Sequence, residues 1–339
     1  MTLGKLSTPG FTWLDGHAEF LRSTRISQEK ALLDLFGRPD GSAAAFRRLG
    51  EAEASVASPR SDDGLWLCAD PVHLCFHHER IVLADAGAFE IDDGEAAALI
   101  TSLNATFADI GVFHAATARR WYLRLNTAVD HVAEPLSAVA GRRMDSELAD
   151  KTSPLHRWLN EVQMFLHLHP VNEQRAAQGK PAINSLWLWG AGVAGMAEQA
   201  AGSADALFAD DPLAIGLGRA TGIAVQPRPT ALAELLDSGA QTPLVVLDQL
   251  LPTVLYENPE NWRQTFADLE NHWFAPLRAQ LSKNLGKTVK NLEIVAPTIY
   301  GRLQWTISGG ERWKFWKKGR PLADIANALA AVPLEGKPS

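Results

Sequence analysis

The sequence predicts an α/β protein in which a three-layer sheet is joined to a compact α+β unit. From Ala206 onward, strand-like apolar runs alternate with helical segments, an order typical of a sheet covered by helices on both faces. Between residues 65 and 150, short strand-like runs surround one alanine-rich helical segment. The 339 residues, 46% of them hydrophobic, are long enough for about two domains with cores of their own.

The first 60 residues are mostly helical in character. One apolar stripe covers residues 31–36 and ends at a glycine and a proline, which favour the end of a helix. Residues 51–64 are small, polar and charged, so they are expected to form a linker or an exposed loop.

Strand signals begin at Leu65. The run LWLCAD is followed by PVHLCF and IVLAD, and the polar turn HHER between the last two predicts a hairpin. Asp92 or Asp93 is expected to cap a helix that extends to about Phe107. The runs IGVFHA and RRWYLRL predict two further strands.

A second helix is predicted from Pro154, with Ser153 at its N-cap, and it ends before Pro170. The polar segment VNEQRAAQGKPAIN is expected to be a loop that leads into the strand SLWLW and the glycine-rich run GAGVAG. Further strands are predicted at ALFAD, TPLVVLDQL and LEIVAPT, and further helices at DPLAIGLGRA, TALAELLDSG and PENWRQTFADLENHWFAPLRAQL. RLQWTIS, a Gly-Gly turn and ERWKFWKK predict a terminal hairpin.

Composition excludes some classes of function. The net charge of −7 argues against a dedicated duplex-DNA binder, which would usually be basic. Two cysteines, Cys68 and Cys75, do not imply a disulfide framework. We see neither a signal peptide nor a run of 18 apolar residues, so we expect a soluble cytoplasmic protein without a membrane partner.

The predicted loop before SLWLW holds the densest group of candidate ligand-binding residues. Arg175 could fork onto a phosphate or a carboxylate, and the amides of Asn172 and Asn184 could orient a ligand. The alternative is structural: both asparagines brace the loop and Arg175 pairs with a local carboxylate.

GAGVAG matches the dinucleotide-binding spacing G-x-G-x-x-G, with Asp210 about twenty residues further on. An NAD(P)-binding oxidoreductase is therefore one alternative function. The helix that would follow is short, and Trp187 and Trp189 are bulky for the strand of such a fold, so we interpret the glycines as a packing turn. We interpret His73 and Cys75 as strand packing, and the lysine-rich ERWKFWKKGR as a soluble edge strand rather than a nucleic-acid platform.

The segment HPVNEQRAAQGKPAINSLWLWGAG resembles the archaeal-type cofactor-independent phosphoglycerate mutases of the alkaline phosphatase superfamily. The motifs WLCADPVHL, RWYLRL and LNEVQMFLHLHPVN are similar to a bacterial branch whose members are called phosphoglycerate mutases or regulators of pathogenicity factors. The resemblance implies an alkaline-phosphatase-like three-layer sheet with an inserted α+β domain. Residues 1–64 and 181–339 would form the phosphatase-like part, and residues 65–180 the inserted domain.

The resemblance also implies a chemistry that this sequence does not fully support. The family uses two divalent metals and a serine that carries the phosphoryl group. Its metal ligands include an N-terminal aspartate, a D-x-x-x-H motif and an Asp-His pair. Here residues 1–10 contain no aspartate, Asp248 is kept without its histidine, and APTIYGRL offers neither member of the pair. Ser42 stands near the position of the family's serine.

We therefore expect a phosphoglycerate-mutase-like protein that has lost the two-metal centre and acts as a binding or regulatory protein with an anion-binding cleft. Its ligand would be a small phosphorylated or carboxylate compound, and no cofactor is expected. The candidate ligand-binding residues, two of them arginines implied by the resemblance, are Arg120, Asn172, Arg175, Asn184 and Trp189. The main alternative is an active mutase or phosphatase whose relocated ligands bind manganese or zinc.

Overall fold

The computed structural model describes nine stretches of the chain, namely 6–38, 42–51, 64–77, 80–128, 133–141, 154–193, 204–283, 289–308 and 318–332. The chain divides into two units. One consists of residues 1–31, 229–241 and 249–339, and the other of residues 32–228 and 242–248. Each unit is described by itself. None of the helices in the described stretches has the length and apolar character needed to cross a bilayer.

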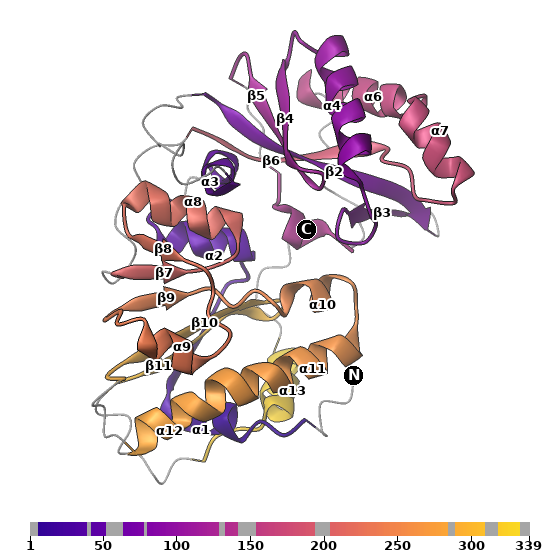
Figure 1. Cartoon of the computed structure of the whole chain (residues 1–339). Helices are drawn as coiled ribbons and strands as arrows, with labels where there is room; N and C mark the ends of the chain where they lie inside the picture. The colour runs from indigo at the N-terminus through magenta and orange to yellow at the C-terminus, as the bar shows by residue number, and fades with distance from the viewer. Residues whose placement is uncertain are drawn as a thin grey trace. The chain divides into compact units, whose positions relative to one another are not determined.

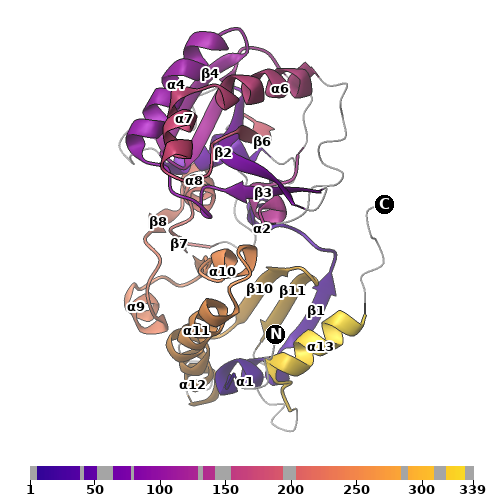
Figure 2. The ribbon, with the colours of Figure 1, turned by 90° about the vertical axis from the view of Figure 1, so that its right-hand side faces the viewer.

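The first unit contains an antiparallel sheet with β11 (Gly301–Ile307) between β1 (Glu19–Ser23) and β10 (Leu292–Thr298), and Figure 2 shows these strands side by side. Its helical elements are α1 (Pro9–His17), α9 (Leu232–Asp237), α10 (Leu251–Leu255), α11 (Pro259–Leu269), the π-helical turn η2 (Glu270–Phe274), α12 (Ala275–Lys283) and α13 (Leu322–Ala331). The buried carboxylate of Glu270 accepts hydrogen bonds from the N–H groups of Gly10 and Phe11, and so caps the N-terminal end of α1.

The second unit contains a five-stranded antiparallel sheet. Its strands are β2 (Trp66–His77), β3 (Arg80–Asp85), β4 (Gly111–Thr117), β5 (Arg120–Leu125) and β6 (Ser185–Gly192), and β2 pairs with β3, β5 and β6. Figure 1 shows α4 (Asp93–Thr106), α6 (Pro154–His167) and α7 (Pro170–Ala177) together on one face. The residues of that face, including Leu67, Leu123 and Leu188, form one buried hydrophobic cluster with residues of the three helices.

The opposite face of this sheet carries α3 (Ala43–Glu51), which also packs closely on α8 (Pro212–Thr221). Glycines allow this approach: a Cβ at Gly216 would lie 1.7 Å from the carbonyl oxygen of Phe46, and one at Gly50 would lie 1.8 Å from that of Pro212. Beside α8 lies a parallel sheet, with β7 (Ala206–Phe208) between β8 (Ala224–Gln226) and β9 (Pro243–Val245). The unit also contains α5 (Leu136–Val139), and α2 (Gln28–Leu35) spans the boundary between the units.

Much of the predicted order of elements is confirmed. The hairpin is β2 and β3, and the helix at Asp92 begins with a capping box in which Asp92 and Glu95 each accept the other's backbone N–H. The segments 51–64 and ERWKFWKK lie almost wholly outside the described residues, and so does the segment that follows GAGVAG.

Three sequence-based expectations are corrected. The predicted loop after His169 begins with the helix α7, which hydropathy misses because only Val171, Asn172 and Arg175 of its residues are buried. The helical N-terminal region contains a strand, β1. Strand β6, expected to belong to the phosphatase-like sheet, pairs with β2 in the antiparallel sheet. The predicted domain boundaries themselves stay a prediction.

We predict that Gly216→Ala destabilises the protein by about 1–3 kcal/mol, because the added methyl group must push α3 away from α8. Urea unfolding measures the change. Gly94→Ala, at an exposed position of α4, is the control and should change stability by about 1 kcal/mol at most. Equal stability of Gly216→Ala and the wild type would contradict the close packing of α3 on α8.

Candidate functional site

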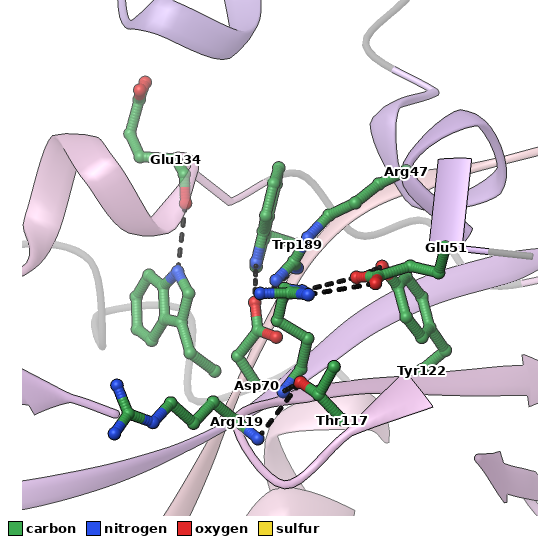
Figure 3. Close-up of polar contacts among 10 residues, drawn as sticks. Arg47, Glu51, Asp70, Thr117, Arg119, Tyr122, Glu134 and Trp189 are labelled. Atoms are coloured by element: carbon green, nitrogen blue, oxygen red, sulfur yellow. Dashed lines mark hydrogen bonds and ion pairs between the residues drawn. The ribbon is translucent and has the colours of Figure 1, made fainter. Parts of the chain in front are cut away.

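A buried polar cluster lies between α3 and the sheet of the second unit (Figure 3). We call it the Arg47 cluster, and its members are Arg47, Glu51, Asp70, Arg120, Tyr122 and Trp189. At its centre, the Arg47 guanidinium donates to Asp70 Oδ2 at 2.7 Å, and Trp189 Nε1 donates to the same oxygen at 2.9 Å. The guanidinium carbon also lies 5.5 Å from the ring centroid of Tyr122 and 5.4 Å from that of Trp189. Asp70 is only 1% exposed.

Electrostatics fix the charge states in this cluster. Burial opposes the charge of Arg47, but its interactions with Asp70 and other neighbouring groups together outweigh this effect and raise the pKa of Arg47 well above its ordinary value. Burial likewise raises the pKa of the Tyr122 hydroxyl well above its ordinary value. Neither group therefore exchanges protons near neutral pH, which favours a structural role over general acid–base catalysis.

Arg120, a predicted ligand-binding residue, is paired within this cluster. Its Nε and a terminal nitrogen donate to the two carboxylate oxygens of Glu51 at 2.5 and 3.0 Å, and Tyr122 also donates to Glu51. The side chain of Arg120 is still 36% exposed. Trp189, the second predicted ligand contact here, is 3% exposed and bonded to Asp70. Arg120 and Trp189 thus bind two different carboxylates of the protein, Glu51 and Asp70.

Each of the three guanidinium nitrogens of Arg175 donates a hydrogen bond within the protein. Its guanidinium donates to the carbonyl oxygen of Pro181 at 2.7 Å, to Glu95 Oε2 at 2.7 Å and to the carbonyl oxygen of Glu90 at 3.0 Å. The residue is 1% exposed. This geometry favours the structural alternative, in which Arg175 ties α7 to the N-terminal end of α4, and gives no support to a direct contact with an external anion.

The asparagine amides act as backbone partners. Asn172 accepts from the N–H of Ile183 and donates to the carbonyl oxygens of Ile183 and Leu166. Asn184 accepts from the N–H of Leu74 and donates to its carbonyl oxygen. Asn104 of α4 makes the same pair of bonds to Phe113. Each amide side chain thus supplies the hydrogen bonds of a missing strand neighbour, a role that spacing in the sequence did not reveal.

The glycines of GAGVAG serve close packing. A Cβ at Gly192 would lie 2.1 Å from that of Ser42, and one at Gly190 would lie 3.0 Å from that of Ala43. Their strand, β6, is antiparallel to β2, whereas a dinucleotide fold needs a parallel strand at this point. The described geometry therefore offers no support for the oxidoreductase alternative.

Ser42 lies immediately before α3 and is 3% exposed. Its hydroxyl accepts a hydrogen bond from Arg38 at 3.2 Å, and the guanidinium of Arg38 lies over the ring of Phe46. A serine that attacks phosphorus must reach a substrate, so the burial of Ser42 does not favour the nucleophilic role.

Charged residues follow the carboxyl ends of the three parallel strands, the edge at which α/β sheets tend to bind ligands. Asp210 and Asp211 follow β7, Arg228 follows β8 and Asp248 follows β9. Arg228 donates to Asp248 Oδ1 at 2.6 Å and lies 3.2 Å from Asp210 Oδ2. Asp211 caps α8 by accepting from the N–H of Ala214. Its pKa is raised mainly by burial, with a contribution from the charge of Asp248.

These donors do not fit a two-metal site. Among the residues that the structure describes, no group of three or more His, Cys, Asp or Glu side chains is placed to hold a metal ion. Asp248, the one carboxylate expected from the resemblance, faces a guanidinium. His73 is bonded through Nδ1 to the carbonyl oxygen of Ala182, in line with its interpretation as strand packing.

Neither a protein-family profile nor a curated protein matches the chain. Two solved structures are similar. The PH0037 protein from Pyrococcus horikoshii is 15% identical over 99% of this chain and 93% of its own, with a TM-score of 0.50. The cofactor-independent phosphoglycerate mutase from Thermoplasma acidophilum DSM 1728 is 17% identical over 96% of this chain and 88% of its own, with a TM-score of 0.46. The predicted α/β class is confirmed, because the described residues form helices with both antiparallel and parallel sheets and the fold is similar to that of the PH0037 protein.

We predict that Arg175→Ala lowers the free energy of unfolding by about 2–5 kcal/mol, because it leaves Glu95 and two carbonyl oxygens without their donor. Arg157→Ala, on the exposed face of α6, is the matched control and should change stability by less than about 0.5 kcal/mol. Thermal and urea unfolding give both values. If Arg175→Ala unfolds like the wild type but loses affinity for phosphate, the structural role is wrong.

Proposed function

We propose that this protein is a phosphoglycerate-mutase-like protein whose two-metal centre has been replaced by an internal ion pair, and that it acts by binding or regulation. The observation that carries this proposal is the contact of Arg228 with both Asp248 and Asp210. All three residues stand at the carboxyl edge of the parallel sheet, where a ligand would be expected.

A guanidinium and a divalent cation compete for the same carboxylate. Asp248 is 27% exposed and Arg228 24%, so this pair is partly shielded from water. To bind a metal through Asp248, the protein would have to separate the pair and leave a half-buried positive charge close to the ion. Like charges at such distances repel strongly in a medium of lowered dielectric constant.

Loss of the metals would remove the means of catalysis. A serine hydroxyl is neutral near pH 7, and a metal or a base must activate it before it can attack phosphorus. Ser42 is buried against Gly192, and its hydroxyl accepts a hydrogen bond from the cation Arg38.

The ligand class we propose is a small phosphorylated or carboxylate compound. Of the two arginines expected to bind it, Arg175 is 1% exposed, whereas the side chain of Arg120 is 36% exposed. Arg120 is therefore the one that an anion could reach, by competing with Glu51 for the guanidinium. Such a competition would couple ligand binding to the C-terminal end of α3, as a regulatory protein requires.

We predict that the purified protein binds no manganese at micromolar concentration and does not interconvert 3- and 2-phosphoglycerate in the presence of manganese or zinc. Titration calorimetry and a coupled mutase assay test this. Arg228→Met frees Asp210 and Asp248 from their cation, and should bind manganese on the order of tenfold more tightly than the wild type.

Arg278→Met, which removes an exposed arginine of α12, is the control and should behave as the wild type does. One equivalent of tightly bound metal in the wild type, together with mutase turnover, would overturn the proposal.

A further inference from the structure

An open groove of about 820 Å³ lies between α4 and the segment formed by α7 and the end of α6. Two polar contacts hold the helices on either side of it. Glu95 of α4 binds Arg175 of α7, and Ser102, two turns further along α4, contacts His169 at the start of α7. Residues seven apart share one face of a helix, so both contacts act on the same side of α4.

His169 has two structural roles. Its Nδ1 accepts a hydrogen bond from the N–H of Val171 and so caps α7, and its Nε2 lies 3.0 Å from Ser102 Oγ. Because Nδ1 is an acceptor, this hydrogen-bond pattern assigns the proton of the neutral imidazole to Nε2, which donates to Ser102. The same pattern rules against a Ser–His catalytic pair, because Nε2 has no lone pair with which to take the serine proton.

Protonation of His169 would remove the cap. A second proton would occupy Nδ1 and face the N–H of Val171, so two donors would meet. The new positive charge would also lie at the N-terminal end of α7, where the helix dipole is positive. Both effects weaken the first turn of α7, which contains Asn172 and leads to Arg175.

The charged groups around this imidazole do not offset its protonation. The groove is also lined by Asp92 and Glu95 from α4 and by Lys180 from the segment after α7, whereas α6 contributes the ring of Phe165. Glu95 is already paired with Arg175, and Lys180 is positive. His169 is 7% exposed, and its burial lowers its pKa below the ordinary value of 6.5.

We propose that His169 is a proton-operated clasp, which holds α7 against α4 across the groove when neutral and releases the first turn of α7 when protonated. The Arg175–Glu95 ion pair keeps the far end of α7 attached. Acidification would therefore widen the groove at one end without unfolding the domain.

The sign of the pH dependence follows from linkage. In the folded state His169 binds its proton less readily than in the unfolded state, because its pKa is lowered. Its stabilising contribution is therefore complete above about pH 6.5 and is lost as the pH falls through the ordinary histidine range towards the folded pKa.

Amide hydrogen exchange of residues 171–177, measured at pH 7 and pH 5 and corrected for the intrinsic rates, tests the clasp. In the wild type, protection of these amides should fall on the order of tenfold at the lower pH. His169→Asn keeps a capping acceptor that does not titrate, and should abolish the pH dependence. His167→Gln, an exposed histidine two residues away, should leave it unchanged.

The clasp is wrong if protection in the wild type does not depend on pH, or if His169→Asn retains the full dependence. Should His169→Asn fail to fold, Ser102→Ala is the second variant. It removes the partner of Nε2 without touching the cap, and should lower the NMR-measured pKa of His169 further and reduce the protection of α7 at neutral pH. An unchanged pKa and unchanged protection in Ser102→Ala would contradict the contact across the groove.

Discussion

The buried ion pair between Arg47 and Asp70 is the interaction on which the second unit depends. It joins α3 to β2 in the face of the sheet opposite the large hydrophobic cluster, and the Trp189 indole from β6 binds the same carboxylate. Removing one partner of such a pair leaves an uncompensated buried charge, at a cost of about 3–5 kcal/mol. Because this ion pair positions α3, it also positions α8, which packs on α3 through glycines. The N-cap of α8 is Asp211, one of the charged residues at the carboxyl edge of the parallel sheet.

Ion pairs between an arginine and a carboxylate of the chain itself also occur elsewhere in the second unit. Arg120 binds Glu51, Arg175 binds Glu95, and Arg228 binds Asp248. Phosphoryl transfer needs cations that are directed at the substrate, because they must stabilise charge that develops there. These arginines bind carboxylates within the chain, which supports the proposed role in binding or regulation.

The sequence predicted the strands and helices well where the pattern was periodic or where a cap was explicit. Asp92 or Asp93 as a cap predicted α4, and the apolar runs on either side of HHER predicted β2 and β3. Helix α7 was missed because its buried residues include Asn172 and Arg175, which hydropathy scores as exposed. Strand β6 was assigned to the wrong sheet because the sequence of an apolar strand does not determine which strand it pairs with. Pairing between strands more than a hundred residues apart depends on tertiary packing.

The candidate site was predictable only in part. Arg120, Trp189, Arg175 and both asparagines make hydrogen bonds within the protein, and their predicted role in ligand binding stays a prediction. Their partners, however, are Glu51, Asp70, Glu95 and backbone groups, which no local spacing reveals. Arg47 was not selected, although its partner Asp70 lies in WLCADPVHL, one of the motifs that carry the resemblance. Arg228 belongs to none of the sequence motifs, and its role was recognised only from its hydrogen bond to Asp248 in the structure.

The central claim is that a guanidinium stands where the resemblance would place a metal. A crystal structure of the protein soaked in millimolar manganese, with anomalous data collected at the manganese edge, tests it most directly. The account predicts that Arg228 stays bonded to Asp248 and Asp210, with no anomalous peak beside them. A manganese ion coordinated by Asp248, with Arg228 turned away, would contradict it.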